Sequence, residues 1–346
     1  MLKWLKQIAL GVLALAVLAV AGGAAYEAIA RASAARTFPA PGRMVDVGGR
    51  RLQLDCRGAG APVVVFESGL DSLGSLAWSA VQDEVAKTTR ACAYSRAGVM
   101  WSDPAQGPFS SARVADDLHK ALAAAGEPPP YVMVGHSLGG PYLLTFTRRH
   151  GNEVAGLIFV DASHPDQLAR LHAAIGRDVD QGEALAKTAD ALAWTGVLRL
   201  AAPKETVLPA HSPAAMAGPA LALFPASLHA TVGEMKGLGP TLAAAGQARR
   251  LGAHPLGDRP LVVLTHGEPF PPQALKQLKI TPAEGARLDA EWLAMQNDEA
   301  TWSTRSRHTV VAGASHYIQF DKPQVVIAAV RDVVGQVRAA KPAPAL

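Results

Sequence analysis

Ser137 is the residue whose surroundings point most directly to covalent chemistry. It is the middle residue of the segment Gly135–Gly139, a G-x-S-x-G sequence that follows an apolar run and precedes residues with helical spacing. A serine in this context sits on a sharp strand-to-helix turn, where side chains at the two glycines would clash with the backbone. The turn also places the serine at a helix N-terminus, whose free N–H groups stabilise an oxyanion. We therefore predict that Ser137 is a catalytic nucleophile.

A serine hydroxyl needs a general base, and His316 is the predicted one. In active sites with a serine nucleophile the base is almost always a histidine, and the chain has eleven histidines. His316 follows the last predicted strand, at the sheet edge where ligands bind. His308 starts that strand and so lies at the opposite edge, while His266 ends a neighbouring strand and is a weaker candidate. His136 adjoins the nucleophile, but the turn is expected to point it away.

The acid that holds the base has two candidates in the sequence. It should lie between the serine and the histidine, at the end of a strand. Asp161 directly follows a predicted strand by a short connection, and we predict that it is the acid; the alternative is that it caps the strand end. Glu268 follows the seventh strand and is the alternative acid, although Pro269 comes next. Asp289 and Asp298 fall on a predicted helix and are expected to face solvent.

Two backbone N–H groups are predicted to form an oxyanion hole. One belongs to Leu138, directly after the nucleophile. The other belongs to Leu70, in the turn after the third strand, where Gly69 lets the backbone bend. Glu67, at the start of that turn, is expected to be structural.

Composition and motif searches argue against several other classes of function. No Cys/His cluster has metal-ligand spacing, and no glycine-rich loop matches a phosphate or dinucleotide cradle, so no cofactor is expected. The net charge is +4, and lysines and arginines are scattered rather than clustered. A nucleic-acid partner is therefore not predicted.

The elements that position these residues alternate between strands and helices. The predicted strands are 44–47, 51–56, 62–66, 90–94, 131–134, 154–160, 261–265 and 309–311. The predicted helices are 78–87, 111–125, 138–150, 282–299 and 323–339. This order predicts an α/β fold with a mostly parallel eight-stranded sheet and helices on both faces.

The alternation of strands and helices is interrupted over residues 163–258, a segment rich in Ala, Leu, Gly and Pro. So long a connection favours a helical lid inserted after the sixth strand. The predicted core therefore comprises 37–162 and 259–340, and 341–346 are expected to be a disordered tail.

The first 36 residues are predicted to be a membrane segment. Lys3 and Lys6 precede an apolar run from about Ile8 to Ala25, close to the roughly 20 residues that span a bilayer. An uncleaved anchor is favoured, and a cleaved signal peptide is the alternative, because short small-residue sequences near 19–25 resemble cleavage sites. The two lysines should stay in the cytoplasm, so the catalytic domain is expected outside it, on the membrane or exported.

Cys56 and Cys92 are the only cysteines. In an exported protein they could form a disulfide, and the alternative is that both are small buried residues in strands.

With these residues in hand, the chain resembles the α/β-hydrolase superfamily over residues 44–340. The likeness rests on the serine turn, the Ser-Gly-Leu turn at 68–70, the segment 94–98 after the fourth strand, and Gly-Ala-Ser-His at 313–316. It is most similar to membrane-anchored or exported bacterial members with a helical cap. Two departures are Ser68-Gly69 in place of His-Gly and Ser95-Arg96 in place of Asp-Arg.

The resemblance implies that Ser137 attacks a carbonyl carbon and that water activated by His316 hydrolyses the acyl-enzyme. Dehalogenases and epoxide hydrolases of this fold use an aspartate nucleophile, so Ser137 argues against both. The leading prediction is hydrolysis of a small-molecule carboxylic ester. Amide or lactone hydrolysis, acyl transfer and cofactor-free haloperoxidation on the same triad are alternatives, and a ligand-binding protein that kept the fold is the non-enzyme alternative. No oligomeric state is predicted.

Overall fold

Eight strands form one sheet, in the order β1-β2-β4-β3-β5-β6-β7-β8. In the computed structural model, which describes residues 2–179, 182–201, 207–249 and 252–340, the predicted fold class is confirmed. The antiparallel pairs are β1–β2 and β2–β4, and the remaining pairs are parallel. The strands are β1 (Arg43–Asp46), β2 (Arg51–Arg57), β3 (Val63–Glu67), β4 (Ala91–Ser95), β5 (Tyr131–His136), β6 (Val154–Val160), β7 (Leu261–His266) and β8 (Ser306–Val311).

Alternate residues of the central strands face two separate cores. Val64 and Phe66 of β3 pack with one core, while Val63 and Val65 of the same strand pack with the other. The first core is covered by α2 (Gln82–Ala86) and α14 (Pro323–Ala339), and the second by α3 (Ser111–Ala125) and α4 (Gly139–His150). Burial on both faces explains why these strands are continuous apolar runs in the sequence.

Most predicted element boundaries agree with the structure to within two residues, and two elements differ by more. The helix predicted over 78–87 is instead a 3-10 helix, η1 (Gly74–Trp78), followed by the single turn of α2. Hydrogen bonds from Ser79 N–H to Leu76 O and from Val81 N–H to Trp78 O tighten the chain between them. Strand β8 begins three residues earlier than predicted, because its first half is polar and lies at the sheet edge, where apolar residues are not needed.

A helical insertion connects β6 to β7. It contains α5 (Gln167–Ile175), α6 (Glu183–Leu192), η3 (Ala193–Thr195), α7 (Val197–Ala201), η4 (Ala214–Met216), α9 (Ala217–Lys236) and α10 (Leu238–Arg249). The side chains of Leu238 and Leu242 pack with Leu138 and Tyr142 at the start of α4. The insertion therefore reaches the segment that carries Ser137. Its predicted role as a lid stays a prediction.

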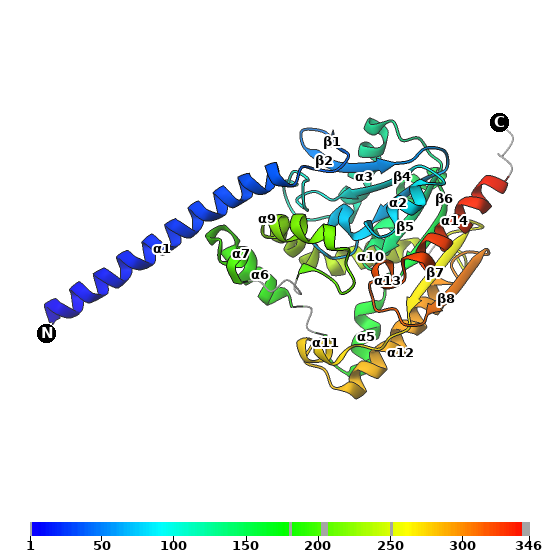
Figure 1. Ribbon diagram of the computed structural model, residues 1–346. Helices are drawn as coiled ribbons and strands as arrows, with labels where there is room; N and C mark the ends of the chain where they lie inside the picture. The colour runs from blue at the N-terminus through cyan, green and yellow to red at the C-terminus, as the bar shows by residue number, and fades with distance from the viewer. Residues whose placement is uncertain (1, 180–181, 202–206, 250–251, 341–346) are drawn as a thin grey trace.

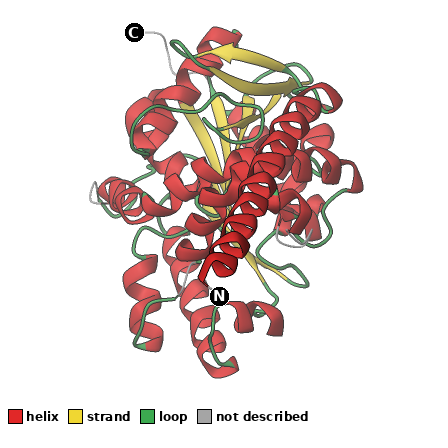
Figure 2. Cartoon of the chain, turned by 90° about the vertical axis from the view of Figure 1, so that its left-hand side faces the viewer, coloured by secondary structure: helices red, strands yellow, loops and turns green. Residues whose placement is uncertain are grey.

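The N-terminal helix α1 (Leu2–Thr37) extends away from the rest of the protein in Figure 1, and in Figure 2, viewed from that side, it lies in front of the rest of the chain. Its large apolar side chains from Trp4 to Val20 are exposed, whereas Glu27 and Ala34, nearer its end, are buried. Within the described chain, α1 and Ala214–Lys236 are the helices long and apolar enough to cross a membrane; the latter is partly buried inside the protein. The predicted tail, 341–346, lies outside the described residues.

The two cysteines form a disulfide, one of the two alternatives for this pair. Cys56 of β2 and Cys92 of β4 are direct partners in the antiparallel ladder, which brings their side chains together on one face.

The remaining helices, α11 (Pro272–Gln277), α12 (Pro282–Glu299) and α13 (Ile318–Asp321), lie near the carboxyl ends of the last strands. Helix α12 begins with a capping box, in which Thr281 and Glu284 satisfy each other's backbone N–H groups. This cap fixes the start of the helix that carries Asp289 and Trp292.

Candidate active site

Ser137 lies on a strained turn between β5 and α4. Its φ is 52°, in the left-handed region that side chains rarely adopt, and strain of this kind concentrates at functional sites. A Cβ atom on Gly139 would lie 2.6 Å from the carbonyl oxygen of Glu67, so only glycine fits there. The Ser137 N–H donates to Val160 O at 3.2 Å, and its own carbonyl accepts from the Ser163 N–H at 2.9 Å. The turn is thus fastened to the end of β6.

Asp161, directly after β6, lies beside His316 in the loop after β8. The Nδ1 atom of His316 is 2.6 Å from Oδ2 of Asp161. The His316 side chain is 39% exposed, whereas that of Asp161 is fully buried. No hydrogen bond joins the Ser137 hydroxyl to another side chain in the described residues; without substrate, catalytic hydrogen bonds are often long or poorly aligned and tighten in the complex.

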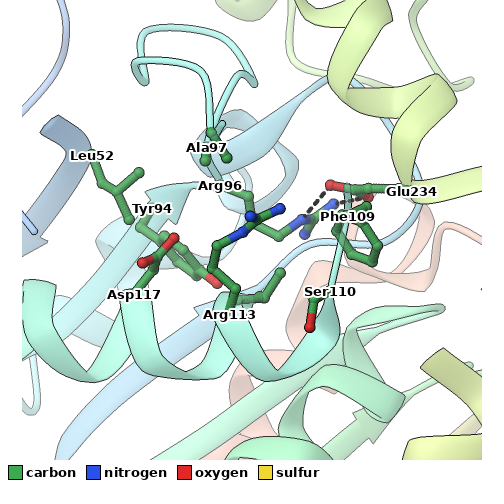
Figure 3. A pocket seen from close by; sticks show the side chains of 11 residues that line it. Leu52, Tyr94, Arg96, Ala97, Phe109, Ser110, Arg113, Asp117 and Glu234 are labelled. Carbon is green, nitrogen blue, oxygen red and sulfur yellow. Dashed lines mark hydrogen bonds and ion pairs between the residues drawn. The ribbon is translucent and has the colours of Figure 1, made fainter. Parts of the chain in front are cut away.

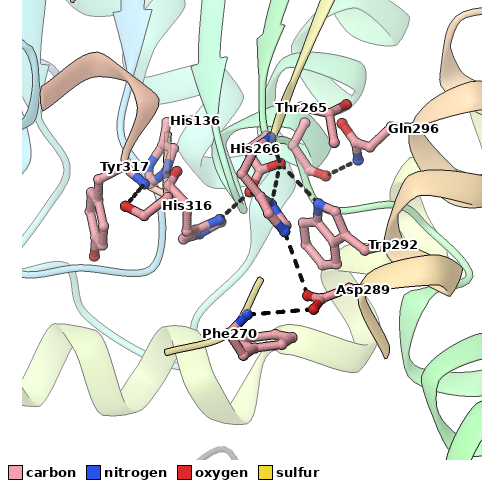
Figure 4. Close-up of polar contacts among 12 residues, drawn as sticks. His136, Thr265, His266, Phe270, Asp289, Trp292, Gln296, His316 and Tyr317 are labelled. Atoms are coloured by element: carbon pink, nitrogen blue, oxygen red, sulfur yellow. Dashed lines mark hydrogen bonds and ion pairs between the residues drawn. The ribbon is translucent and has the colours of Figure 1, made fainter. Parts of the chain in front are cut away.

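Four N–H groups converge on the Asp161 carboxylate (Figure 4). They come from His316 Nδ1, from the backbone and Nδ1 of His266, and from Trp292 Nε1, at distances between 2.6 and 3.0 Å. Burial alone would raise the pKa of Asp161, but the hydrogen bonds from His266 and His316 hold it below its usual range. The carboxylate therefore stays ionised and is fixed in one orientation toward His316.

His266 holds Asp161 rather than serving as a second base. Its Nδ1 faces Asp161, and its Nε2 lies 3.7 Å from Asp289 of α12. Burial lowers the pKa of His266, yet its interactions with the two carboxyl groups, chiefly the hydrogen bond to Asp161, outweigh burial and raise it to about 10. We call His266, Asp161 and Asp289 the histidine cluster.

Two sequence expectations for helix α12 were wrong. Asp289 and Asp298 were expected to face solvent, but Asp289 pairs with His266, and Asp298 lies 2.8 Å from Nε2 of the buried His164. Sequence reasoning also missed Trp292. The available signal was spacing, because Asp289 and Trp292 are three residues apart and so share one face of the helix.

Glu268, the alternative acid, makes no hydrogen bond to His316 among the described residues. Its side chain is exposed beyond the end of β7, and its backbone N–H donates to Ala314 O at 3.0 Å. Of the two candidates, the structure brings Asp161 to the histidine.

The predicted oxyanion turn packs directly against the nucleophile. A Cβ atom on Gly69 would lie 2.9 Å from Cβ of Ser137, so the close approach requires glycine. Neither the Leu70 nor the Leu138 N–H donates to another group in the described chain, which leaves both donors open to a substrate oxygen.

His136 turns toward the His316 loop, not toward solvent. Its Nε2 lies 2.9 Å from the carbonyl oxygen of His316, and the two rings are 4.6 Å apart. Burial, with a smaller contribution from His316, lowers the pKa of His136 to about 3. A neutral His136 thus supports the backbone of the loop that carries the predicted base.

A family model described as "alpha/beta hydrolase fold" matches residues 61–323, which include all of the residues above. The chain belongs to the α/β-hydrolase fold family. Solved structures of similar fold include an esterase from Thermogutta terrifontis, with a TM-score of 0.54 and 19% identity over 85% of this chain and 97% of that one. Another is an epoxide hydrolase from Bacillus megaterium, with a TM-score of 0.57 and 16% identity over 85% of this chain and 100% of that one.

Curated relatives share only part of this α/β hydrolase. The "Probable transporter efuK" of Hormonema carpetanum is 37% identical over 128 residues, which are 35% of this chain and 18% of that protein. The chain thus spans less than a fifth of that relative.

A buried arginine in this α/β hydrolase supports the predicted oxyanion turn, and Figure 3 shows its pairing with Glu234. Arg96 lies 2.7 Å from Glu67 and 2.8 Å from Glu234 of α9, and it donates to Gly69 O at 2.7 Å. We call Arg96, Glu67 and Glu234 the arginine cluster. Burial, opposed by Arg96, raises the pKa of Glu67 to about 7. Glu67 is bonded to Arg96 and Tyr94 beside the turn, and its expected structural role stays a prediction.

The cavity beside the arginine cluster is too small for a substrate. Its volume is about 30 Å³, enough for about one water molecule, and its lining includes Tyr94, Phe109 and Arg113.

One group of side chains in the α/β hydrolase has the composition of a metal site. The ligand atoms of Asp161, His266 and His316 lie within 4.8 Å of one another. Both imidazoles, however, direct Nδ1 at the same carboxylate at hydrogen-bonding distance, which accounts for the arrangement without an ion. In the second such group, the sulfurs of Cys56 and Cys92 are joined in the disulfide.

Proposed function

We propose that this α/β hydrolase cleaves carboxylic esters of small molecules, with Ser137 as nucleophile, His316 as general base and Asp161 as the acid that orients it. The observation that carries the proposal is the 2.6 Å contact between His316 and the buried Asp161, at the sheet edge that also holds the strained Ser137. A buried, ionised carboxylate on Nδ1 leaves Nε2 as the atom that accepts the serine proton.

The reaction proceeds in two halves. Oγ of Ser137 attacks the carbonyl carbon while Nε2 of His316 takes its proton, and the oxyanion accepts hydrogen bonds from the N–H groups of Leu70 and Leu138. His316 then gives the proton to the departing alcohol, which leaves an acyl-enzyme. Water attacks the acyl carbon with His316 again as base, and the acid and Ser137 are released.

The identity of the nucleophile favours esters over epoxides. Fold neighbours include both an esterase and epoxide hydrolases, and the fold alone does not choose between these reactions. Opening an epoxide on this fold uses a carboxylate nucleophile, whereas the turn here carries a hydroxyl, which suits acyl transfer.

We also propose that α1 is a retained membrane anchor and that residues 163–258 form a lid, with the domain on the non-cytoplasmic side. Three features support this: Lys3 and Lys6 flank the apolar run, the first part of α1 is exposed, and Leu238 and Leu242 of the insertion pack beside Leu138.

The test uses the full chain in detergent with p-nitrophenyl acetate, butyrate and octanoate and with a fluorophosphonate probe. Wild type should hydrolyse at least one ester and be labelled, and Ser137→Ala should lose labelling and activity by several orders of magnitude. Folded wild type that is neither labelled nor active would overturn the proposal, as would Ser137→Ala with activity equal to that of wild type.

A further inference from the structure

Large apolar side chains gather on the outer surface of the insertion, on the segment from α6 to α7. Five of them, all within 185–200, are between 40% and 77% exposed, and exposed apolar side chains that cluster, unlike single ones, mark contact sites for protein or membrane. They are Leu185, Leu192, Trp194, Val197 and Leu200. We call these five residues the apolar segment.

The membrane helix docks onto this same segment through a close backbone contact. A Cβ atom on Gly23 of α1 would lie 2.2 Å from the carbonyl oxygen of Thr195, and one on Gly196 would lie 2.9 Å from the carbonyl oxygen of Gly23. Because only glycines permit this approach, α1 and the start of α7 meet in a fixed register. Figure 1 shows α6 and α7 beside α1.

A buried ion pair fastens the contact. Arg199 of α7 donates to both carboxylate oxygens of Glu27, at 2.6 and 3.0 Å, and the two side chains are 8% and 3% exposed. A bidentate pair of this kind fixes the orientation of the two helices as well as their separation. The apolar segment therefore has a defined height along α1.

That height corresponds to the outer face of a bilayer. Gly23 is 17 residues beyond Lys6, the last charged residue before the apolar run, or about 26 Å at about 1.5 Å per residue, which is close to the roughly 30 Å thickness of the hydrocarbon core. With Lys6 at the cytoplasmic boundary, Thr195 and its neighbours lie near the opposite boundary. Trp194 is a residue type enriched at that level.

We propose that the apolar segment inserts into the outer interface of the lipid bilayer, next to the point where α1 leaves it. The proposal rests on the proposed membrane span of α1. Lipid is the occupant because the exposed apolar surface of α1 continues directly onto the apolar segment at Gly23. An insertion resting in lipid would place the hydrolase where acyl esters partition, which favours lipid-soluble substrates.

The experiment measures the depth of single fluorophores in the full chain, reconstituted in phosphatidylcholine nanodiscs at one copy per disc. Leu15→Cys in α1, Leu200→Cys in α7 and Val310→Cys in β8 each carry an environment-sensitive dye; all three native side chains are exposed, so folding is preserved. The native cysteines are joined in a disulfide and do not react. Lipids with a nitroxide near the headgroup end of the acyl chain quench dyes at the interface.

We expect strong quenching at Leu200→Cys, with a blue-shifted emission, and none at Val310→Cys, which lies at the far end of the sheet (Figure 1). If Leu15→Cys is buried in lipid but Leu200→Cys behaves like Val310→Cys, the inference is wrong and the span stands. If Leu15→Cys is also in water, the span itself fails. A second preparation holds two copies per disc. If the dye at Leu200→Cys is shielded from water there but not in discs with one copy, a second chain covers the apolar segment, and the proposal is overturned.

Discussion

The arginine cluster and the histidine cluster hold two loops of the proposed active site in the same way, with one cation between two carboxyl groups. They differ in access to water. The arginine cluster is at most 3% exposed, whereas His266 and Asp289 of the histidine cluster are 13% and 22% exposed. Because arginine keeps its proton, the group that titrates in the arginine cluster is the carboxyl of Glu67, and burial raises its pKa to about 7. In the histidine cluster the fully buried Asp161 stays ionised, and the imidazole of His266 titrates with a pKa raised to about 10.

The two clusters also differ in what they connect. Through Glu234, the arginine cluster joins the oxyanion turn to α9 of the insertion. The histidine cluster joins only elements of the core, because Asp161 follows β6, His266 ends β7 and Asp289 lies on α12. A movement of α9 would therefore reach the oxyanion turn directly, whereas the acid is linked to the insertion through α5, whose Arg170 pairs with Glu291 of α12.

Replacing the acid should have the largest effect. In Asp161→Asn the carboxylate that fixes the tautomer of His316 is lost, so kcat should fall by about 10⁴-fold. Glu268→Gln, at the other candidate acid, should leave kcat within about twofold of wild type in the same ester assay. Glu268 is exposed, so its substitution removes at most a weak surface interaction. A larger loss in Glu268→Gln than in Asp161→Asn would reverse the assignment.

Removing the cation of the arginine cluster should have the next largest effect, which should be a loss of stability. Arg96→Met leaves two buried carboxyl groups without their cation, with only the tyrosine hydroxyls of Tyr94 and Tyr142 as partners, which should lower the free energy of unfolding by about 3–5 kcal/mol. The control is Arg51→Met, because Arg51 is 60% exposed and pairs with Asp103 at the surface, where a pair is worth about 1 kcal/mol or less. Equal shifts of the urea midpoint in the two variants would contradict the role of the cluster.

The candidate catalytic residues that lie at the carboxyl ends of strands could be predicted from the sequence. Ser137, Asp161 and His316 each follow a predicted strand, and the carboxyl ends of parallel strands meet at one edge, so position along the chain was sufficient to nominate them. The fold class followed from the same alternation of apolar runs and helical spacing.

Sequence reasoning did not find the residues that support that site. Glu234 and Arg96 are 138 positions apart, and their contact depends on how α9 packs over the oxyanion turn. A charged residue on a helix is usually solvated, so Asp289 carried no sign of its burial against β7. Such partners depend on tertiary packing, which local patterns do not encode.

Replacing the titratable cation of the histidine cluster should remove a pH dependence. Because the pKa of His266 is raised to about 10, the folded state holds a proton that the unfolded state loses above about 6.5. Its contribution to stability should be full below pH 6.5 and disappear as the pH rises through 10. Urea midpoints of wild type should exceed those of His266→Gln at pH 6 and converge with them by pH 10. A difference that is constant across this range would show that His266 contributes only packing.

The smallest effect should come from removing one of the donors to Asp161 while keeping its aromatic ring. Trp292→Phe deletes the Nε1–H that lies 3.0 Å from Oδ1 of Asp161. A hydrogen bond to a charged group contributes at least about 1.5 kcal/mol, so its loss should lower kcat about tenfold. KM should stay unchanged, because Trp292 is not expected to contact the substrate. The matched control is Trp302→Phe, since Nε1 of the buried Trp302 has no partner among the described residues. If both variants lost kcat equally, the ring of Trp292 rather than its N–H would be what holds the acid.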